Sequence, residues 1–251
     1  MDDPIAALAD QQEALTRILT DLDADGWHRP TRCEGWDVAD VVLHLTQTNE
    51  MAIGSARGDY DAVLSRLTGG LEQAASVDDG AAKMVERDRG ASDADILVRW
   101  STSAEELLAA LAAEDPSERV QWVAGQLSVR TLATTRLAET WIHAGDVVDA
   151  LGMDLPATDG LALIARLAWR TLPYAFSSAG RTMSGPVAFR LTGPDGSGCE
   201  FIPDGTATTT ISGPVAHLCL VAARRVRASA TDLHGEGPDS EAVLELVRTY
   251  A

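Results

Sequence analysis

The chain has 251 residues, of which 45% are hydrophobic and 23% are charged, a composition typical of soluble globular proteins. Its formal net charge of −18 and its pI of about 4.5 argue against binding to nucleic acid or to anionic membranes, because both favour a basic surface. The length suits one large domain or two small ones.

The start of the chain is acidic and lacks the apolar core of a signal peptide, and no segment has the length of an apolar membrane span. The three cysteines, Cys33, Cys199 and Cys219, are odd in number and are not arranged as a CxxC motif. This pattern fits a reducing compartment better than a disulfide framework. We therefore expect a cytoplasmic protein.

The first third of the chain predicts two helices joined by a loop. Asp3 and Pro4 are typical N-cap and first-turn residues, and apolar residues at helical spacing follow to about Ala24. The stretch DGWHRPTRCEGW contains glycine and proline breaks and predicts a loop. Asp37 is the expected N-cap of the second helix, in which His44 borders the apolar stripe.

The middle of the chain predicts further helices. Residues 59–90 have a weaker pattern, interpreted as one or two helices with glycine breaks. Another helix is expected to start at Ser92 or Asp93 and to end before Pro116. The stretch RVQWVAGQLS predicts a loop or a short extended segment, and a long helix is expected from about Ser128 to Leu151.

The composition changes after Gly152. A helix is expected from Gly160 to Phe176, followed by the alternating runs VAFRLTG, GCEFIP and ATTTISG. The turn signals PDGSG and DG between these runs favour antiparallel strands. The stretch PVAHLCLVAARRV predicts a helix, and a last helix is expected from about Asp239 to Tyr250. We therefore predict an α+β protein, with an all-α domain at residues 1–155 and a small α+β domain with an antiparallel sheet at residues 156–251.

Three side chains in the predicted helical domain suggest a metal centre. Glu139 and His143 are four residues apart and would lie on one face of the same helix, and His44 lies on another helix. Two imidazoles and one carboxylate are a typical ligand set for a catalytic zinc-type ion with one open position. A buried carboxylate is costly unless it is paired or bound to a metal, so a cation would explain this face. A buried hydrogen-bonded network without metal is the alternative.

Two stretches resemble a known family. RPTRCEGWDVADVVLHL and RLAETWIHAGDVVDALG are similar to the mycothiol-dependent maleylpyruvate isomerase-like family, within the DinB-like four-helix metal-binding bundles. The pattern of this family corresponds here to Trp36, Asp40, His44, Glu139, His143 and Asp146. The C-terminal half resembles the small sterol-carrier-like domain of the same family, more loosely than the N-terminal half does.

The resemblance implies a divalent metal held by His44, Glu139 and His143, and mycothiol as a thiol cofactor whose sulfur would take the open metal position. Zinc is the usual metal, and nickel or iron would suit the same ligands. Asp146 would orient a ligand, or else make a hydrogen bond that stabilises the fold. Trp36 is a further candidate for the thiol site, as are Trp122 and Gln126 in the segment before the long helix. By family position, Arg224 or Arg225 would be a carboxylate clamp.

Each of these residues also has an interpretation without a functional role. Trp36 could simply pack at the start of its helix, and Trp122 and Gln126 could lie in an exposed loop. Arg224 and Arg225, expected next to each other on a helix, could form salt bridges. Cys33 is interpreted as incidental, although a helix N-terminus can favour a thiolate.

The expected activity is isomerisation or S-transfer on a small electrophilic substrate, which could carry a carboxylate, through a metal-activated thiolate. Two alternatives stay open. A thiol-independent metallohydrolase could use the same ligands, and a non-enzymatic carrier could hold a small apolar ligand in the C-terminal domain. The expected partners are a small-molecule substrate and the thiol, with no nucleic acid and no membrane, in a monomer or a dimer.

Overall fold

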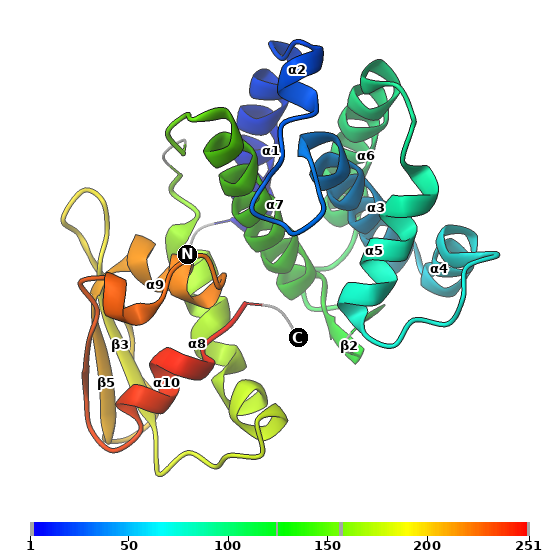
Figure 1. Ribbon diagram of the computed structural model, residues 1–251. Coiled ribbons are helices and arrows are strands. Elements are labelled where there is room, and N and C mark those ends of the chain that lie inside the picture. Colours follow the sequence, from blue (N-terminus) through cyan, green and yellow to red (C-terminus); the bar gives the residue numbers. More distant parts are fainter. Residues whose placement is uncertain (1–2, 124, 156–157, 250–251) are drawn as a thin grey trace. The chain divides into compact units, whose positions relative to one another are not determined.

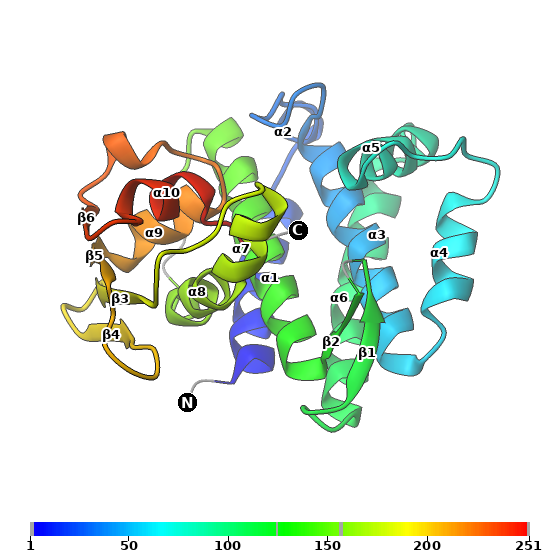
Figure 2. The same cartoon turned by 90° about the horizontal axis from the view of Figure 1, so that it is seen from below.

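The computed structural model describes residues 3–123, 125–155 and 158–249. These residues form two compact units, one from Asp3 to Thr158 and the other from Asp159 onward (Figures 1 and 2). The N-terminal unit is mainly helical, and the C-terminal unit combines helices with a small sheet. The α+β class predicted from the sequence is confirmed. Among the described residues, no helix is long and apolar enough to cross a membrane.

Four long helices form a bundle in the N-terminal unit. They are α1 (Pro4–Thr20), α3 (Val38–Arg57), α6 (Asp93–Ala113) and α7 (Val129–Leu151). Helix α3 packs against α6 and α7, and α1 packs against the same two helices. The shorter helices α4 (Tyr60–Thr68) and α5 (Val77–Asp88) pack against α3. This arrangement places the middle of α3 and α7 inside the bundle, where His44 and His143 lie.

Local signals in the sequence explain where these helices begin. Asp3, Asp37, Ser92 and Ser128 are N-cap residues, and the side chain of each accepts a hydrogen bond from a backbone N–H of the first turn. At α3 this becomes a capping box, because the Asp40 side chain also accepts from the backbone N–H of Asp37. The predicted helix starts therefore rest on contacts that the structure contains.

Two details of the N-terminal unit refine the prediction. The stretch expected to be a loop starts within a short helix, α2 (Ala24–Trp27), because Asp23 caps it by accepting from Gly26 N–H at 2.8 Å. The stretch before α7 is extended and forms a hairpin of β1 (Arg119–Trp122) and β2 (Gly125–Ser128). The helical unit therefore also contains a two-stranded sheet.

Trp100 is the largest fully buried side chain of the bundle, and it allows a test of the packing. Its indole N–H donates to Thr16 Oγ1 at 2.9 Å, which joins α6 to α1. We expect Trp100→Ala to lower the free energy of unfolding by about 3–5 kcal/mol, because it leaves a cavity and removes the hydrogen bond to Thr16 Oγ1. Urea denaturation measures this loss. Val98→Ala on the same helix is the control, since Val98 is 66% exposed and should change stability by less than about 0.5 kcal/mol.

The C-terminal unit contains a four-stranded sheet in the order β4-β3-β5-β6. The strands are β3 (Val187–Thr192), β4 (Gly198–Phe201), β5 (Thr209–Pro214) and β6 (His234–Glu236). Helices α8 (Leu161–Ser178), α9 (Val215–Ala222) and α10 (Ser240–Leu246) belong to the same unit, with the 3-10 turn η1 (Ala228–Ala230). Trp169 of α8 fastens the helix layer to the sheet, because its indole N–H donates to Val187 O at 2.8 Å.

Three sequence predictions for this unit need correction. Strands β3 and β5 pair in parallel, so the DG signal before β5 belongs to a crossover connection and not to a hairpin between neighbouring strands. The other two pairings, β3 with β4 and β5 with β6, are antiparallel. The last helix ends at Leu246 instead of reaching Tyr250, and Tyr250 itself lies outside the described residues. Helix α9 ends at Ala222, so Arg224 and Arg225 follow the helix and are not part of it.

Candidate metal centre

The structure brings His44, Glu139 and His143 together inside the bundle. One ligand atom from each lies within 4.8 Å of the others. Glu139 Oε2 is 3.8 Å from His44 Nε2 and 3.8 Å from His143 Nε2, and the two imidazole rings are 4.9 Å apart in an edge-on arrangement. Ligand atoms on a tetrahedral zinc lie about 3.4 Å apart, so a small side-chain adjustment would close this group around an ion.

Helix geometry explains this grouping. Glu139 and His143 are one turn apart on α7, and His44 projects from α3, which packs against α7. The three side chains keep 24%, 11% and 12% of their surface exposed, in the order Glu139, His143 and His44. The group is therefore almost enclosed, and its carboxylate is the part most open to solvent.

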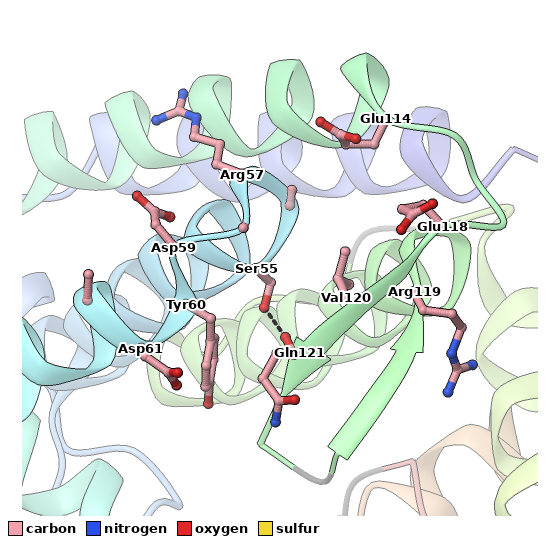
Figure 3. A pocket seen from close by; sticks show the side chains of 13 residues that line it. Ser55, Arg57, Asp59, Tyr60, Asp61, Glu114, Glu118, Arg119, Val120 and Gln121 are labelled. Carbon is pink, nitrogen blue, oxygen red and sulfur yellow. Dashed lines mark hydrogen bonds between the residues drawn. The ribbon is translucent and has the colours of Figure 1, made fainter.

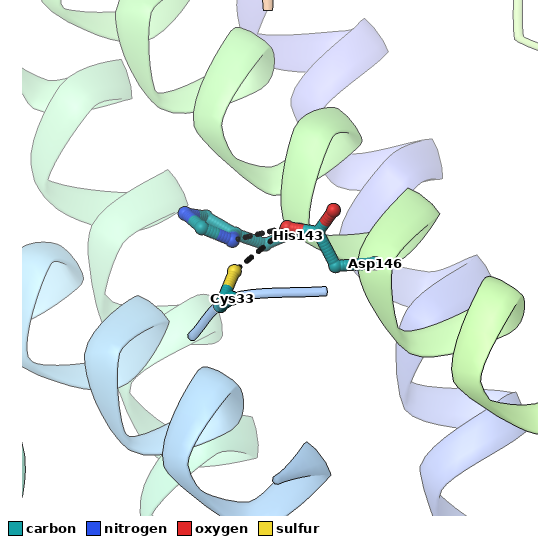
Figure 4. A group of neighbouring side chains, drawn as sticks. All are labelled: Cys33, His143 and Asp146. Carbon is teal, nitrogen blue, oxygen red and sulfur yellow. Dashed lines mark hydrogen bonds and ion pairs between the residues drawn. The ribbon is translucent and has the colours of Figure 1, made fainter. Parts of the chain in front are cut away.

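A second contact fixes His143. Its Nδ1 lies 2.9 Å from Asp146 Oδ2, and Asp146 is 1% exposed (Figure 4). Cys33 Sγ donates to the same oxygen at 3.3 Å, and Arg32 Nε lies 3.7 Å from Asp146 Oδ1. Because the carboxylate accepts from Nδ1–H, Nε2 of His143, which faces Glu139, is the nitrogen that can bind a metal. Cys33, interpreted from the sequence as incidental, therefore contacts the residue that orients His143.

The charges of the group are strongly coupled. Burial alone raises the pKa of Glu139, but the hydrogen bond from His44 and the positive charges of His143 and Arg136 lower it to about 2. Burial alone lowers the pKa of His143, but Asp146, Cys33 and the charge of Glu139 raise it to about 9. Burial lowers the pKa of His44, which Glu139 only partly offsets. Without metal at neutral pH, the group therefore holds a carboxylate, a charged His143 and a neutral His44.

The donor set fits a divalent metal. Two imidazole nitrogens and a carboxylate oxygen converge, and one of the imidazoles has a carboxylate on its far nitrogen, as ligating histidines usually do. His44 departs from that pattern, because its buried Nδ1 has no hydrogen-bond partner among the described residues. The Trp36 ring lies 5.2 Å from the His44 ring and is tilted by 45° against it.

The remaining candidates from the sequence make other contacts. Asp40, at the start of α3, forms a salt bridge with Arg89, which donates to its two carboxylate oxygens at 3.0 and 2.8 Å. Trp122 and Gln126 are on the β1–β2 hairpin, where Trp122 lies 6.1 Å from the Tyr60 ring and Gln126 is exposed. Arg224 and Arg225 belong to the C-terminal unit, where Arg224 Nη1 donates to Glu245 O at 2.6 Å and Arg225 Nη1 to Ala223 O at 2.9 Å.

A cavity of about 620 Å³ lies in the N-terminal unit beside the hairpin (Figure 3). The end of α3, the start of α4 and strand β1 supply most of its walls. Gln121 and Tyr60 line it, but the three candidate metal ligands do not. Its charged side chains are of both signs: Arg57, Asp59, Asp61, Glu114, Glu118 and Arg119. The cavity is thus separate from the candidate metal centre.

Comparisons with known proteins agree with this geometry. The family model described as the mycothiol maleylpyruvate isomerase N-terminal domain matches residues 8–148, more than half of the chain. The chain belongs to this family. An uncharacterized protein of Mycobacterium tuberculosis, found in two strains, is 30% identical over 255 residues, which cover 100% of this chain and 97% of the relative.

Solved structures give the fold of the family. Two crystal structures of the mycothiol-dependent maleylpyruvate isomerase, one of them of an H52A mutant, match with a TM-score of 0.59 at 18% and 19% sequence identity. Each comparison covers 94% of both chains, so the likeness includes the C-terminal unit as well as the bundle. At this identity the likeness establishes the fold and not the substrate.

Arg136 is a residue that the sequence analysis did not single out. It precedes Glu139 by three residues on α7 and is 1% exposed, although it carries a charge. The signal in the sequence was its place in RLAETWIH, on the face that carries the two candidate ligands.

Proposed function

We propose that this protein is a divalent-metal- and mycothiol-dependent enzyme that isomerises, or transfers sulfur to, a small electrophilic substrate. The observation that supports the proposal most is the convergence of His44, Glu139 and His143 within 4.8 Å inside the bundle. Membership of the family makes mycothiol the thiol to test first. We further propose that the two compact units correspond to the helical metal-binding domain and the small α+β domain expected from the sequence.

His44, Glu139 and His143 would hold the metal, with zinc as the first candidate. A bound divalent cation would lower the pKa of a thiol ligand and so supply a soft nucleophile at neutral pH. Such a nucleophile can add reversibly to an activated double bond, or attack an electrophilic carbon and remain attached to it. Neither outcome requires an external oxidant or reductant.

The side chains of the protein would prepare this chemistry. Asp146 accepts the Nδ1 proton of His143 and so keeps its Nε2 directed at Glu139. Glu139 supplies one negative charge toward the cation, and the bundle leaves it the most exposed of the three side chains. The ring of Trp36, 5.2 Å from the His44 ring, would shield this side of the centre from water. We assign Trp36 to the wall of the thiol site on this ground.

Calorimetric titration of the zinc-loaded protein with mycothiol tests the proposal. We expect one mycothiol per chain, and no binding of the oxidised disulfide form, which lacks the thiol that would reach the metal. Binding should disappear from protein stripped of zinc and return when zinc is restored. If zinc-loaded protein binds no mycothiol, the thiol-dependent function is wrong and a thiol-independent metallohydrolase takes its place.

A further inference from the structure

Arg136 is a buried cation that has no counterion in the described part of the chain. It is 1% exposed, and no carboxylate oxygen lies within 4.0 Å of its guanidinium among the described residues. Its Nη2 donates to Asn49 Oδ1 at 3.1 Å, and its Nε is buried without a hydrogen-bond partner in that part of the chain. Asn49 is itself fully buried and neutral, so it cannot offset the charge.

Burial of Arg136 in this arrangement lowers the stability of the fold. A buried guanidinium that makes one hydrogen bond to a neutral amide leaves most of its five donors unused, and charges are seldom buried without a partner. Burial lowers the pKa of Arg136 to about 10 and the charge of Glu139 acts in the opposite direction, so the side chain is still a cation at pH 7. Structural arginines are normally paired, whereas a ligand-binding arginine must keep donors free.

The position of Arg136 connects it to the candidate metal centre. It lies one helical turn from Glu139 and two turns from His143 on the same face of α7. Thr140 lies on this face too, and its buried Oγ1 also has no hydrogen-bond partner among the described residues. Within the described part of the chain, Arg136 Nε and Thr140 Oγ1 are thus two buried polar atoms without partners, and their residues are one turn apart on the face of α7 that carries Glu139.

We propose that Arg136 is the binding site for a carboxylate group of the small-molecule substrate. The planar guanidinium can hold both carboxylate oxygens, and Thr140 could donate to the same group. The substrate would then extend along α7 from Arg136 toward Glu139, which would bring its reactive carbon near the metal position. The choice of an anionic ligand rests on the proposed function, because it assumes a divalent cation bound to Glu139. That cation would more than offset the charge of Glu139, so Arg136 would need another negative charge as its partner.

This assignment differs from the one that the family resemblance suggests. Arg224 and Arg225 were expected to clamp a carboxylate, but each donates to a backbone carbonyl of the C-terminal unit. Arg136 instead lies on the helix that carries two of the candidate ligands. A substrate that reacts at the metal would therefore meet Arg136 on the same helix as Glu139 and His143.

A pair of matched probes tests the proposal. Butyrate and butyramide have nearly the same shape, but only butyrate carries a carboxylate. We expect butyrate to raise the thermal unfolding midpoint of the zinc-loaded protein in carboxylate-free buffer, and butyramide to leave it unchanged. Arg136→Gln should weaken butyrate binding at least tenfold, Arg136→Lys should weaken it less, and Arg17→Gln, which removes an arginine with a 71% exposed side chain, should not change it.

Two further readouts separate this proposal from its alternatives. Arg136→Met should leave the unfolding midpoint of the ligand-free protein unchanged or higher, because it removes an unpaired buried charge, whereas a structural arginine would give a clear loss. Metal content of the variants reports on the proposed function independently, and it should stay at the wild-type level. Equal binding of butyrate by wild type and Arg136→Gln, with or without zinc, would overturn the assignment of Arg136 even if the metal is present.

Discussion

Glu139→Gln is expected to abolish metal binding. Wild-type protein purified without a metal-binding affinity tag should carry about one zinc-type ion per chain, and the variant should carry less than about a tenth of that. Glu139 Oε2 lies 3.8 Å from both imidazole nitrogens and would be the anionic ligand of the group. Glutamine keeps the shape of the side chain but removes its negative charge. Mass spectrometry of the metal content, after extensive dialysis, measures the difference.

His28→Ala is the matched control for this experiment. His28 is a histidine of the same unit that contacts two carboxylates, Asp37 at 3.0 Å and Asp93 at 3.6 Å, but it is 61% exposed and outside the candidate centre. It should keep the full metal content. Metal stabilises the state that binds it, so a chelator should lower the unfolding midpoint of wild type and of His28→Ala, but not of Glu139→Gln. If the wild-type protein carries no metal, the metal-site prediction is wrong and the three side chains form a buried polar network.

The helical unit could be predicted from the sequence because its signals are local. A cap such as Asp37 or Ser128 acts on residues two or three positions away, and the helical period is visible in a single turn. The candidate centre followed from the same regularity, since Glu139 and His143 are neighbours on any helix that contains them. His44 could be named as a third candidate, but neither segment alone indicates that α3 packs against α7, so its place in the group was supported by the family resemblance.

The remaining features depend on contacts between distant residues. Strand β5 pairs with β3 in parallel, and the short DG turn before β5 carries no information about which strand it will join. Arg224 has a positive φ of 60°, which ends the helical path at a point where alanine-rich sequence gave no break. Arg136 was not singled out from the sequence, and only the packing of α7 shows that it is buried with no counterion among the described residues.

Zinc binding at pH 7 is expected to release about one proton per chain. In the metal-free protein the pKa of His143 is raised to about 9, since Asp146, Cys33 and Glu139 together outweigh burial. His143 must lose this proton before Nε2 can bind a metal, whereas the lowered pKa of His44 leaves that residue already neutral. The apparent zinc affinity should therefore fall about tenfold for each pH unit below 9, or about 100-fold between pH 9 and pH 7.

The same shifts fix the sign of the stability profile without metal. The raised pKa of His143 stabilises the fold fully below pH 6.5, and this contribution is lost as the pH rises through about 9. The lowered pKa of Glu139 stabilises the fold above pH 4.5, and this contribution is lost as the pH falls through about 2. The contributions of His143 and Glu139 together should make metal-free protein most stable between about pH 4.5 and 6.5.

Asp146→Asn tests whether Asp146 holds the proton that zinc binding displaces from His143. The asparagine can still accept a hydrogen bond from Nδ1–H of His143, but it lacks the charge that holds the second proton on the ring. The pKa of His143 should fall, so zinc binding at pH 7 should release less than about half a proton. The zinc affinity of the variant should then depend little on pH above pH 7. Calorimetry in buffers of different ionisation enthalpy counts these protons. A wild-type affinity that is the same at pH 7 and pH 9 would show that Asp146 does not hold His143 in its charged form.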